Sequence, residues 1–197
     1  DSGMSRGLGD VYKRQGYGGN IPGVGSSVYV MNLENGKILK EINIEDVNGN
    51  GIANSIPATP VVITPDMVMN ANYRGALVYV NDLEGKITKI NLTNMIDDRS
   101  QTNAVQSISM YDTNTIFSAE STSENGRYMF HSMEAGIGAD TNNLWLFAGT
   151  GNYKNLNDVG LSTDKTKIDN LLIGIKDEYF PNYKNNFATL SSNTNTI

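Results

Sequence analysis

One hairpin pattern occurs twice in this chain and constrains its fold more than any other feature. The segment SSVYVMNLENGKILKEI (residues 26–42) returns about 50 residues later as ALVYVNDLEGKITKI (residues 76–90). Each copy has an alternating apolar run, a turn with glycine and a second alternating run, which is the pattern of a β-hairpin. Two such hairpins at this spacing predict repeated sheets that cover one another's faces, as the blades of a β-propeller do.

The alternation also predicts the details of the first hairpin. Asn35-Gly36 is the dipeptide that favours a two-residue type I′ turn. The period of two in the returning strand places Ile38, Ile42 and Ile44 on one face. We therefore expect that face to pack into the core.

Short apolar runs separated by Gly, Asn and Asp predict an all-β chain without a long amphipathic helix. At roughly 40 to 50 residues per blade, the chain would hold about three to four blades, a truncated piece of a larger propeller. Residues 16–180 would form this partial propeller, and the polar residues 181–197 would be a loose or truncated tail. Further strands are expected at residues 59–64 and 171–176, and two further strand pairs at residues 107–110 with 115–118 and residues 127–133 with 143–149.

The first fifteen residues have the character of a non-native segment. GLGDVYKRQ (residues 7–15) resembles translated adaptor sequence at the ends of environmental gene fragments. The alternative is a natural flexible loop. On the adaptor interpretation, residues 1–15 are not part of the fold, and any export signal would lie upstream of this fragment.

Composition excludes several classes of function. The formal net charge is −6 and no block of basic residues occurs, which argues against nucleic-acid binding. No apolar run approaches the roughly 20 residues of a transmembrane helix. Cysteine is absent, and His131 is the only histidine, so thiol catalysis and multi-histidine metal centres are excluded within this chain.

One loop has the spacing of a calcium ligand set. DVNGNGIAN (residues 46–54) matches the first half of the Asp-x-Asn-x-Asn-Gly calcium loop. Its ligands would be the Ile52 carbonyl and the side chains of Asp46, Asn48, Asn50 and Asn54. Position twelve, where a bidentate acid is expected, is proline, so the site would bind calcium with low affinity. The alternative is a Gly/Asn turn without metal.

Other polar and aromatic residues have simpler interpretations. Gly149 and Gly151 suit a sharp strand exit. His131 is expected to be a structural or surface histidine, and Trp145, within an apolar strand, to belong to the core. Asp97-Asp98 is expected to lie in a solvated loop. Together these interpretations predict no catalytic residue, and calcium is the only cofactor considered.

Three ordered blocks together resemble one family, the PilC/PilY proteins of type IV pili. GYGG (16–19) with the segment 25–36 looks like the family's "SGY…GxxLYVxDxxTG" blade. IPATPVV (56–62) with the segment 72–90 is similar to "PxxVD…xYAGDLxGNLWRFDL". LFAGTGNY (146–153), Asp158 and NLLIGIKD (170–177) resemble "YFGTGRYL…D…QSxYGIxD".

The resemblance implies a non-enzymatic binding and assembly module of a pilus biogenesis and adhesion protein. Its partners would be pilins or other pilus components and host or surface ligands, at the cell surface or outer membrane. The family's calcium loop would fall at residues 63–70, where only Asp66 and Asn70 could ligate. The polar loops 94–103 and 154–167 are the expected contact surfaces.

The sequence leaves two other hypotheses about function open. The Tyr-Val-x-x-Leu-x-x-Gly hairpin is shared with quinoprotein (PQQ-type) dehydrogenases, whose propellers resemble one another in being Trp-rich with a vicinal Cys pair. This chain has one Trp and no Cys. The third reading is a generic outer-membrane scaffold propeller.

Overall fold

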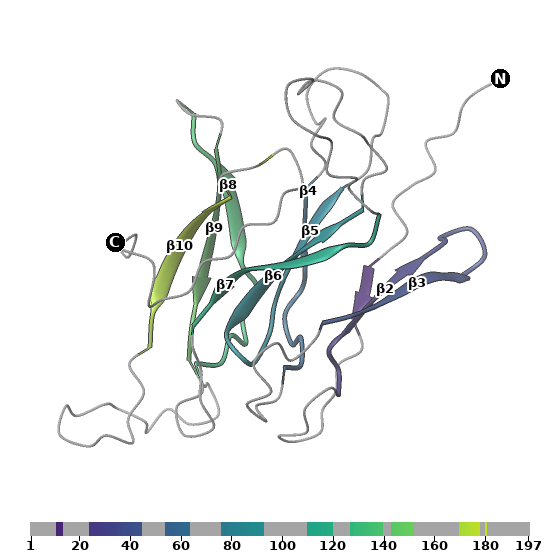
Figure 1. Ribbon diagram of the computed structural model, residues 1–197, viewed down its shortest axis with the longest axis horizontal. Coiled ribbons are helices and arrows are strands. Elements are labelled where there is room, and N and C mark those ends of the chain that lie inside the picture. The colour runs from purple at the N-terminus through teal and green to yellow at the C-terminus, as the bar shows by residue number, and fades with distance from the viewer. Residues whose placement is uncertain are drawn as a thin grey trace.

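Alternating residues form ten β-strands in the part of the chain that the computed structural model describes (Figure 1). The described residues are 11–13, 24–44, 54–63, 76–92, 110–119, 127–139, 143–151, 170–177 and 180. Their regular secondary structure is all β-strand, which confirms the all-β part of the predicted fold class. The strands are β1 (Val11–Lys13), β2 (Ser27–Met31), β3 (Ile38–Asn43), β4 (Val61–Ile63), β5 (Leu77–Asn81), β6 (Lys86–Asn91), β7 (Thr113–Ser118), β8 (Glu134–Ile137), β9 (Leu144–Gly149) and β10 (Leu172–Asp177).

These strands form three small antiparallel sheets. The first sheet is β1-β2-β3, the central sheet is β4-β5-β6-β7 and the third sheet is β8-β9-β10. Each is an up-and-down meander, because neighbours in the sheet are also neighbours in the chain. In Figure 1 the blue-green central sheet lies between the purple first sheet and the green and yellow third sheet.

The central sheet is buried on both faces. Leu77 and Tyr79 of β5 belong to a core cluster that includes residues of β9 and β10. Val78 and Val80, which alternate with them, belong to a second cluster with residues of β2 and β3. Because successive side chains of a strand point to opposite faces, one flanking sheet covers each face of the central sheet.

The two repeated hairpins have the same pairing register. Tyr29 of β2 lies opposite Glu41 of β3, and Tyr79 of β5 lies opposite Lys89 of β6. The pairs toward the open end of each hairpin correspond in the same way. The predicted repeat of two hairpins is therefore confirmed at the level of individual residue pairs.

The prediction that Ile38 shares a face with Ile42 and Ile44 is wrong. A bulge in β3 leaves Leu39 without a partner in the register, and Ile38 lies opposite Met31. The extra residue reverses the alternation, so Ile42 and Ile44 are buried while Ile38 is 53% exposed.

The predicted type I′ turn is also wrong. Such a turn needs positive φ at both central residues. Gly36 has a φ of 70° and the equivalent Gly85 a φ of 79°, but the only non-glycine with positive φ in the described ranges is Tyr111. Each hairpin therefore turns with a single left-handed glycine, and Asn35 is the additional residue of the first loop.

The first and central sheets meet through equivalent faces of their hairpins. We call the face with Tyr29 or Tyr79 the tyrosine face, and the face with Val28 and Val30, or Val78 and Val80, the valine face. All four valines lie in one core cluster. Blades of a propeller are related by rotation about a central channel, which brings unlike faces together. These hairpins do not have that relation, and the partial propeller of three to four blades stays a prediction.

Most of the other predicted strands are present, with two differences. β9 pairs with β8 and not with residues 127–133, which contribute only an isolated bridge between Met129 and Gly151. β7, whose residues 115–118 were expected to pair with residues 107–110, lies in the central sheet and pairs with β6. Residues 107–109, the loops 94–103 and 154–167 and the tail 181–197 lie outside the described residues.

β1 uses residues 11–13, which belong to the segment expected to be adaptor-derived. It pairs with β2 in antiparallel register, with Tyr12 opposite Tyr29. The origin of residues 1–15 is a separate question from this pairing and stays a prediction, as do the domain boundaries.

Candidate functional site

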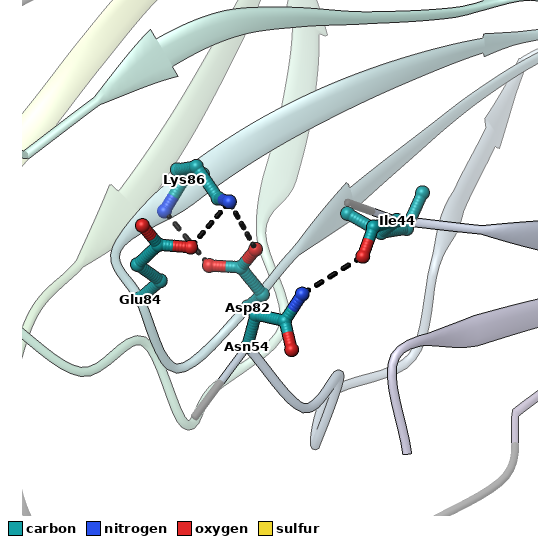
Figure 2. Close-up of polar contacts among 5 residues, drawn as sticks. All are labelled: Ile44, Asn54, Asp82, Glu84 and Lys86. Atoms are coloured by element: carbon teal, nitrogen blue, oxygen red, sulfur yellow. Dashed lines mark hydrogen bonds and ion pairs between the residues drawn. The ribbon is translucent and has the colours of Figure 1, made fainter. Parts of the chain in front are cut away.

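Asn54 is the one described side chain of the predicted calcium loop. It is buried, and its Nδ2 donates a hydrogen bond of 2.8 Å to the Ile44 carbonyl (Figure 2). This bond joins the residues on either side of the loop that the motif occupies. Since the amide nitrogen is used in this bond, Asn54 would ligate a cation through Oδ1.

The other proposed ligands, Asp46, Asn48, Asn50 and Ile52, lie outside the described residues, as do Asp66 and Asn70. Among the residues that the structure describes, no three His, Cys, Asp or Glu side chains gather closely enough to hold a metal ion. The calcium site stays a prediction.

A cluster of charged side chains is buried at the turn between β5 and β6 (Figure 2). The Lys86 ammonium forms an ion pair with Glu84 and lies 3.9 Å from Asp82 Oδ2. The Lys86 backbone N–H donates to Asp82 Oδ1 at 3.0 Å. All three residues are about 1% exposed, so two carboxylates share one cation away from solvent.

This arrangement changes the acidity of Asp82. Burial raises the pKa of its carboxyl from 3.8 to about 7, and the Glu84 charge adds to the increase, whereas Lys86 opposes it. The reason is that burial penalises the charged form of an acid. Asp82 is therefore an acid that titrates near neutral pH.

A second buried charged group joins the central and third sheets. Asp177 of β10 accepts a hydrogen bond of 2.7 Å from the Tyr79 hydroxyl and one of 2.6 Å from the Lys89 ammonium, both at Oδ2. The ammonium also lies 5.9 Å from the centre of the Tyr79 ring. All three residues are fully buried, so an opposed strand pair of one sheet is fixed to a strand of the next.

Burial dominates the acid–base properties of this group as well. It raises the pKa of the Tyr79 hydroxyl, and the Asp177 charge raises it further. Burial lowers the pKa of Lys89, against the opposing effect of Asp177. The charges compensate each other inside the protein, as buried charges must.

The equivalent positions of the first hairpin are open to solvent. Tyr29 donates a hydrogen bond of 2.7 Å to Glu41 Oε1, and Ser27 donates one of 2.6 Å to Asn43 Oδ1. Glu41 and Asn43 are exposed, and Tyr29 is half-buried. The same hairpin pattern thus has a buried tyrosine face in the central sheet and a partly exposed one in the first sheet.

The remaining predicted residues lie apart from these groups. His131 is exposed, and its carbonyl accepts a hydrogen bond of 2.9 Å from Asn81 Nδ2. Trp145 is not in the core: it is half-buried, because the alternate residues Leu144 and Leu146 take the inner face of β9. Asp97-Asp98 and Asp158 lie outside the described residues.

The glycine-rich exit of β9 has a structural role. Thr150 exchanges backbone and side-chain hydrogen bonds with Leu171, at 2.8 and 2.7 Å, which close β9 onto the start of β10. Gly149 and Gly151 flank it, and Gly151 has a φ of 151°. β9 thus ends at Gly149, as expected for a strand exit at these glycines.

The sequence analysis did not identify either buried charged group. A signal was present, because Lys86, Lys89 and Asp177 stand in apolar strands and Tyr79 alternates with valines. The contact between Lys89 and Asp177 spans 88 positions, and local periodicity says nothing about such distant partners.

Comparisons with known proteins identify no relative of this chain. No family model, curated protein or solved structure matches the chain. None of the described residues forms a helix with the length and hydrophobicity that a membrane crossing requires.

Proposed function

We propose that this chain is a binding and assembly module of a type IV pilus biogenesis and adhesion protein, located at the cell surface, and that it is not an enzyme. The proposal rests on the resemblance of the three ordered blocks to the PilC/PilY family. Its partners would be pilins or other pilus components.

One structural observation supports the proposal: each of the three blocks contributes to a different sheet. The first block includes β2 and its turn, the second includes β5 and most of β6, and the third includes β10 and most of β9. The second and third blocks meet directly, since Tyr79 and Lys89 bind Asp177. Residues that match the family motif are therefore also the residues that connect the sheets.

The proposal also includes a fold: the sheets would be blades of a partial β-propeller. A four-stranded antiparallel meander, such as the central sheet, has the form of one propeller blade. The third sheet is a second meander that packs on one of its faces. The first sheet departs from the pattern, because it meets the central sheet through equivalent faces.

Calcium would act in this module by ordering the loop 46–54. Asn54 supports this part of the proposal, because its bond to Ile44 holds the two ends of the loop together. Titration of calcium into the purified chain should release or absorb heat, with a millimolar dissociation constant as expected for a site with few carboxylates. The Asp46→Asn variant should lose this signal, and an unchanged signal would remove the loop from the account.

The experiment that tests the proposed function measures binding of purified type IV pilin subunits to the immobilised chain. The expected result is saturable binding that an acidic all-β protein of similar size does not reproduce. Circular dichroism of the same sample establishes that the chain is folded. Absence of binding to major and minor pilins by the folded chain would contradict the proposal.

A further inference from the structure

The turn of the first hairpin contains Asn35-Gly36, a dipeptide for which the proposed function has no use. Both residues are exposed to solvent. A Cβ on Gly36 would meet no atom within 4 Å, so the space beside its main chain is open. Within the described ranges, Asn35 is the only asparagine that is followed by glycine. This pair therefore joins an accessible side-chain amide to a main-chain nitrogen that no side chain shields.

A hydrogen bond folds the Asn35 side chain back over the Gly36 peptide. Its Oδ1 accepts from the Lys37 backbone N–H at 2.9 Å, which is the side-chain turn that asparagine forms with the main chain two residues on. An N–H that donates to a carbonyl oxygen also stabilises the negative charge that develops there when a nucleophile attacks the carbon. The turn thus prepares the Asn35 Cγ for attack.

The Gly36 nitrogen is the nucleophile within reach of that carbon, and one hydrogen bond restrains it. Its N–H donates to the Asn32 carbonyl at 2.8 Å, so this bond must open before the nitrogen can lose its proton and attack. The turn lies beyond Met31 and Ile38, the last residue pair of β2 and β3. It can therefore open locally while the sheet stays paired.

We propose that Asn35 is a site of spontaneous deamidation in the folded chain, with water as the co-reactant. The Gly36 nitrogen gives its proton to a base in solution and forms a bond to Asn35 Cγ. The Cγ–Nδ2 bond then breaks, and Nδ2 takes a proton from water and leaves as ammonia. Water opens the resulting cyclic imide at either carbonyl: cleavage at Cγ gives aspartate, and cleavage at the main-chain carbonyl carbon gives isoaspartate. No step needs an oxidant or a reductant.

Both products change the turn and leave the core untouched. Each adds a negative charge next to Glu34. Isoaspartate also runs the main chain through Cγ, which lengthens the turn and takes the Oδ1 acceptor away from Lys37. Residues 33–40 are all exposed, so the converted chain should remain folded.

The test incubates the full chain at neutral and at mildly alkaline pH and follows the tryptic peptide 15–37 by mass spectrometry, with an unincubated sample as reference. Asn35 should lose its amide and give separate aspartate and isoaspartate peaks. The loss should be faster at the higher pH, because the nucleophile is the deprotonated nitrogen. Asn32 in the same peptide, which leucine follows, should keep its amide.

Two variants assign the signal to the folded turn. Asn35→Gln should abolish it, because the longer side chain would have to close a larger ring. Ile116→Val removes a buried methyl group from β7 and should raise the unfolded population about two- to tenfold. The rate at Asn35 should stay the same in this variant, because the turn opens without unfolding of the chain.

A synthetic peptide of residues 15–37 provides the rate in the absence of the fold. A folded chain that keeps Asn35 intact would overturn the proposal, whether or not the free peptide converts. So would a rate at Asn35 that rises with the unfolded population in Ile116→Val. Asn48, Asn50 and Asn125, which also precede glycine, fall in other tryptic peptides. None of these results depends on pilin binding, so this proposal and the proposed function can fail separately.

Discussion

At the scale of single residues, the same hairpin pattern holds its charges in opposite environments. Glu84, Lys86 and Lys89 of the second hairpin are buried, whereas the equivalent residues of the first hairpin, Glu34, Lys37 and Glu41, are exposed. A buried charge depends on its partner far more than an exposed one does. The central sheet should therefore respond to charge substitutions that the first sheet tolerates.

Asp82 should make the protein less stable as the pH rises. Its pKa is raised from 3.8 to about 7, so the native state binds a proton that the unfolded chain releases between these values. The stability from this proton is present at acid pH and is lost as the pH rises through about 7. Urea unfolding should give a midpoint that falls as the pH rises toward about 7 and levels off above it. Asp82→Asn should flatten that slope.

The first hairpin offers the control for Asp82. Asn32 holds the equivalent position in a turn that lies largely in solvent. Asn32→Asp adds a carboxylate there, and it should titrate near its ordinary pKa and leave the slope above about pH 5.5 unchanged. A slope that survives in Asp82→Asn would mean that another group causes the pH dependence.

Removing Lys89 should destabilise the protein strongly. Lys89→Met removes the ammonium that pairs with the Asp177 carboxylate and leaves the Tyr79 hydroxyl as the other donor in this buried group. Breaking a buried ion pair in this way costs about 3 to 5 kcal/mol. The double variant Lys89→Met/Asp177→Asn should recover much of that loss, because it removes the uncompensated charge. Urea denaturation of the single and double variants measures both effects.

The matched change in the first hairpin is Glu41→Gln. It replaces the carboxylate that accepts the exposed Tyr29 hydrogen bond with a neutral amide, and it should cost less than about 1 kcal/mol. Equal losses for Lys89→Met and Glu41→Gln would contradict the assignment of Lys89 to a buried pair.

At the scale of the elements, the sequence predicted the repeat but not its irregularity. Alternation located both hairpins and the strands β4, β9 and β10, because period two is a local property of the chain. It failed at Ile38, since one bulged residue reverses the alternation without a composition signal. It failed for the turn, because Asn35-Gly36 forms part of a longer loop with one left-handed glycine.

Deletion of Leu39 should be tolerated. The deletion would give the first hairpin the continuous register that the second has between Val80 and Asn81. Leu39 is exposed, so little buried apolar surface is lost. We expect a melting temperature within a few degrees of the wild type.

Deletion of Thr88 is the matched control. Leu39 is the additional residue after Ile38, and Thr88 follows Ile87, which is the counterpart of Ile38 in the second hairpin. It would move Lys86 and Ile87 to the opposite faces of a sheet that is buried on both sides. We expect this variant to unfold. A chain that tolerates the loss of Thr88 but not of Leu39 would contradict the register.

At the scale of the whole molecule, the sequence could not tell which face of a hairpin meets which sheet. Both faces of β5 are apolar, so the pattern is compatible with either neighbour on either side. The same limit explains why Asp177 was not recognised as the partner of Lys89. In the structure the valine face of the first hairpin meets the central sheet, so its tyrosine face lies on the opposite side.

The contact between equivalent valine faces is the central claim, and nuclear Overhauser effects between methyl groups test it most directly. In a sample with labelled methyl groups, Val28 and Val30 should show cross-peaks to Val78 and Val80, which share their core cluster. The Tyr79 ring should show cross-peaks to Ile173 and Ile175 of β10, which share its own cluster. Cross-peaks from Val28 and Val30 to the Tyr79 ring would instead place unlike faces together, as in consecutive propeller blades, and would contradict this account.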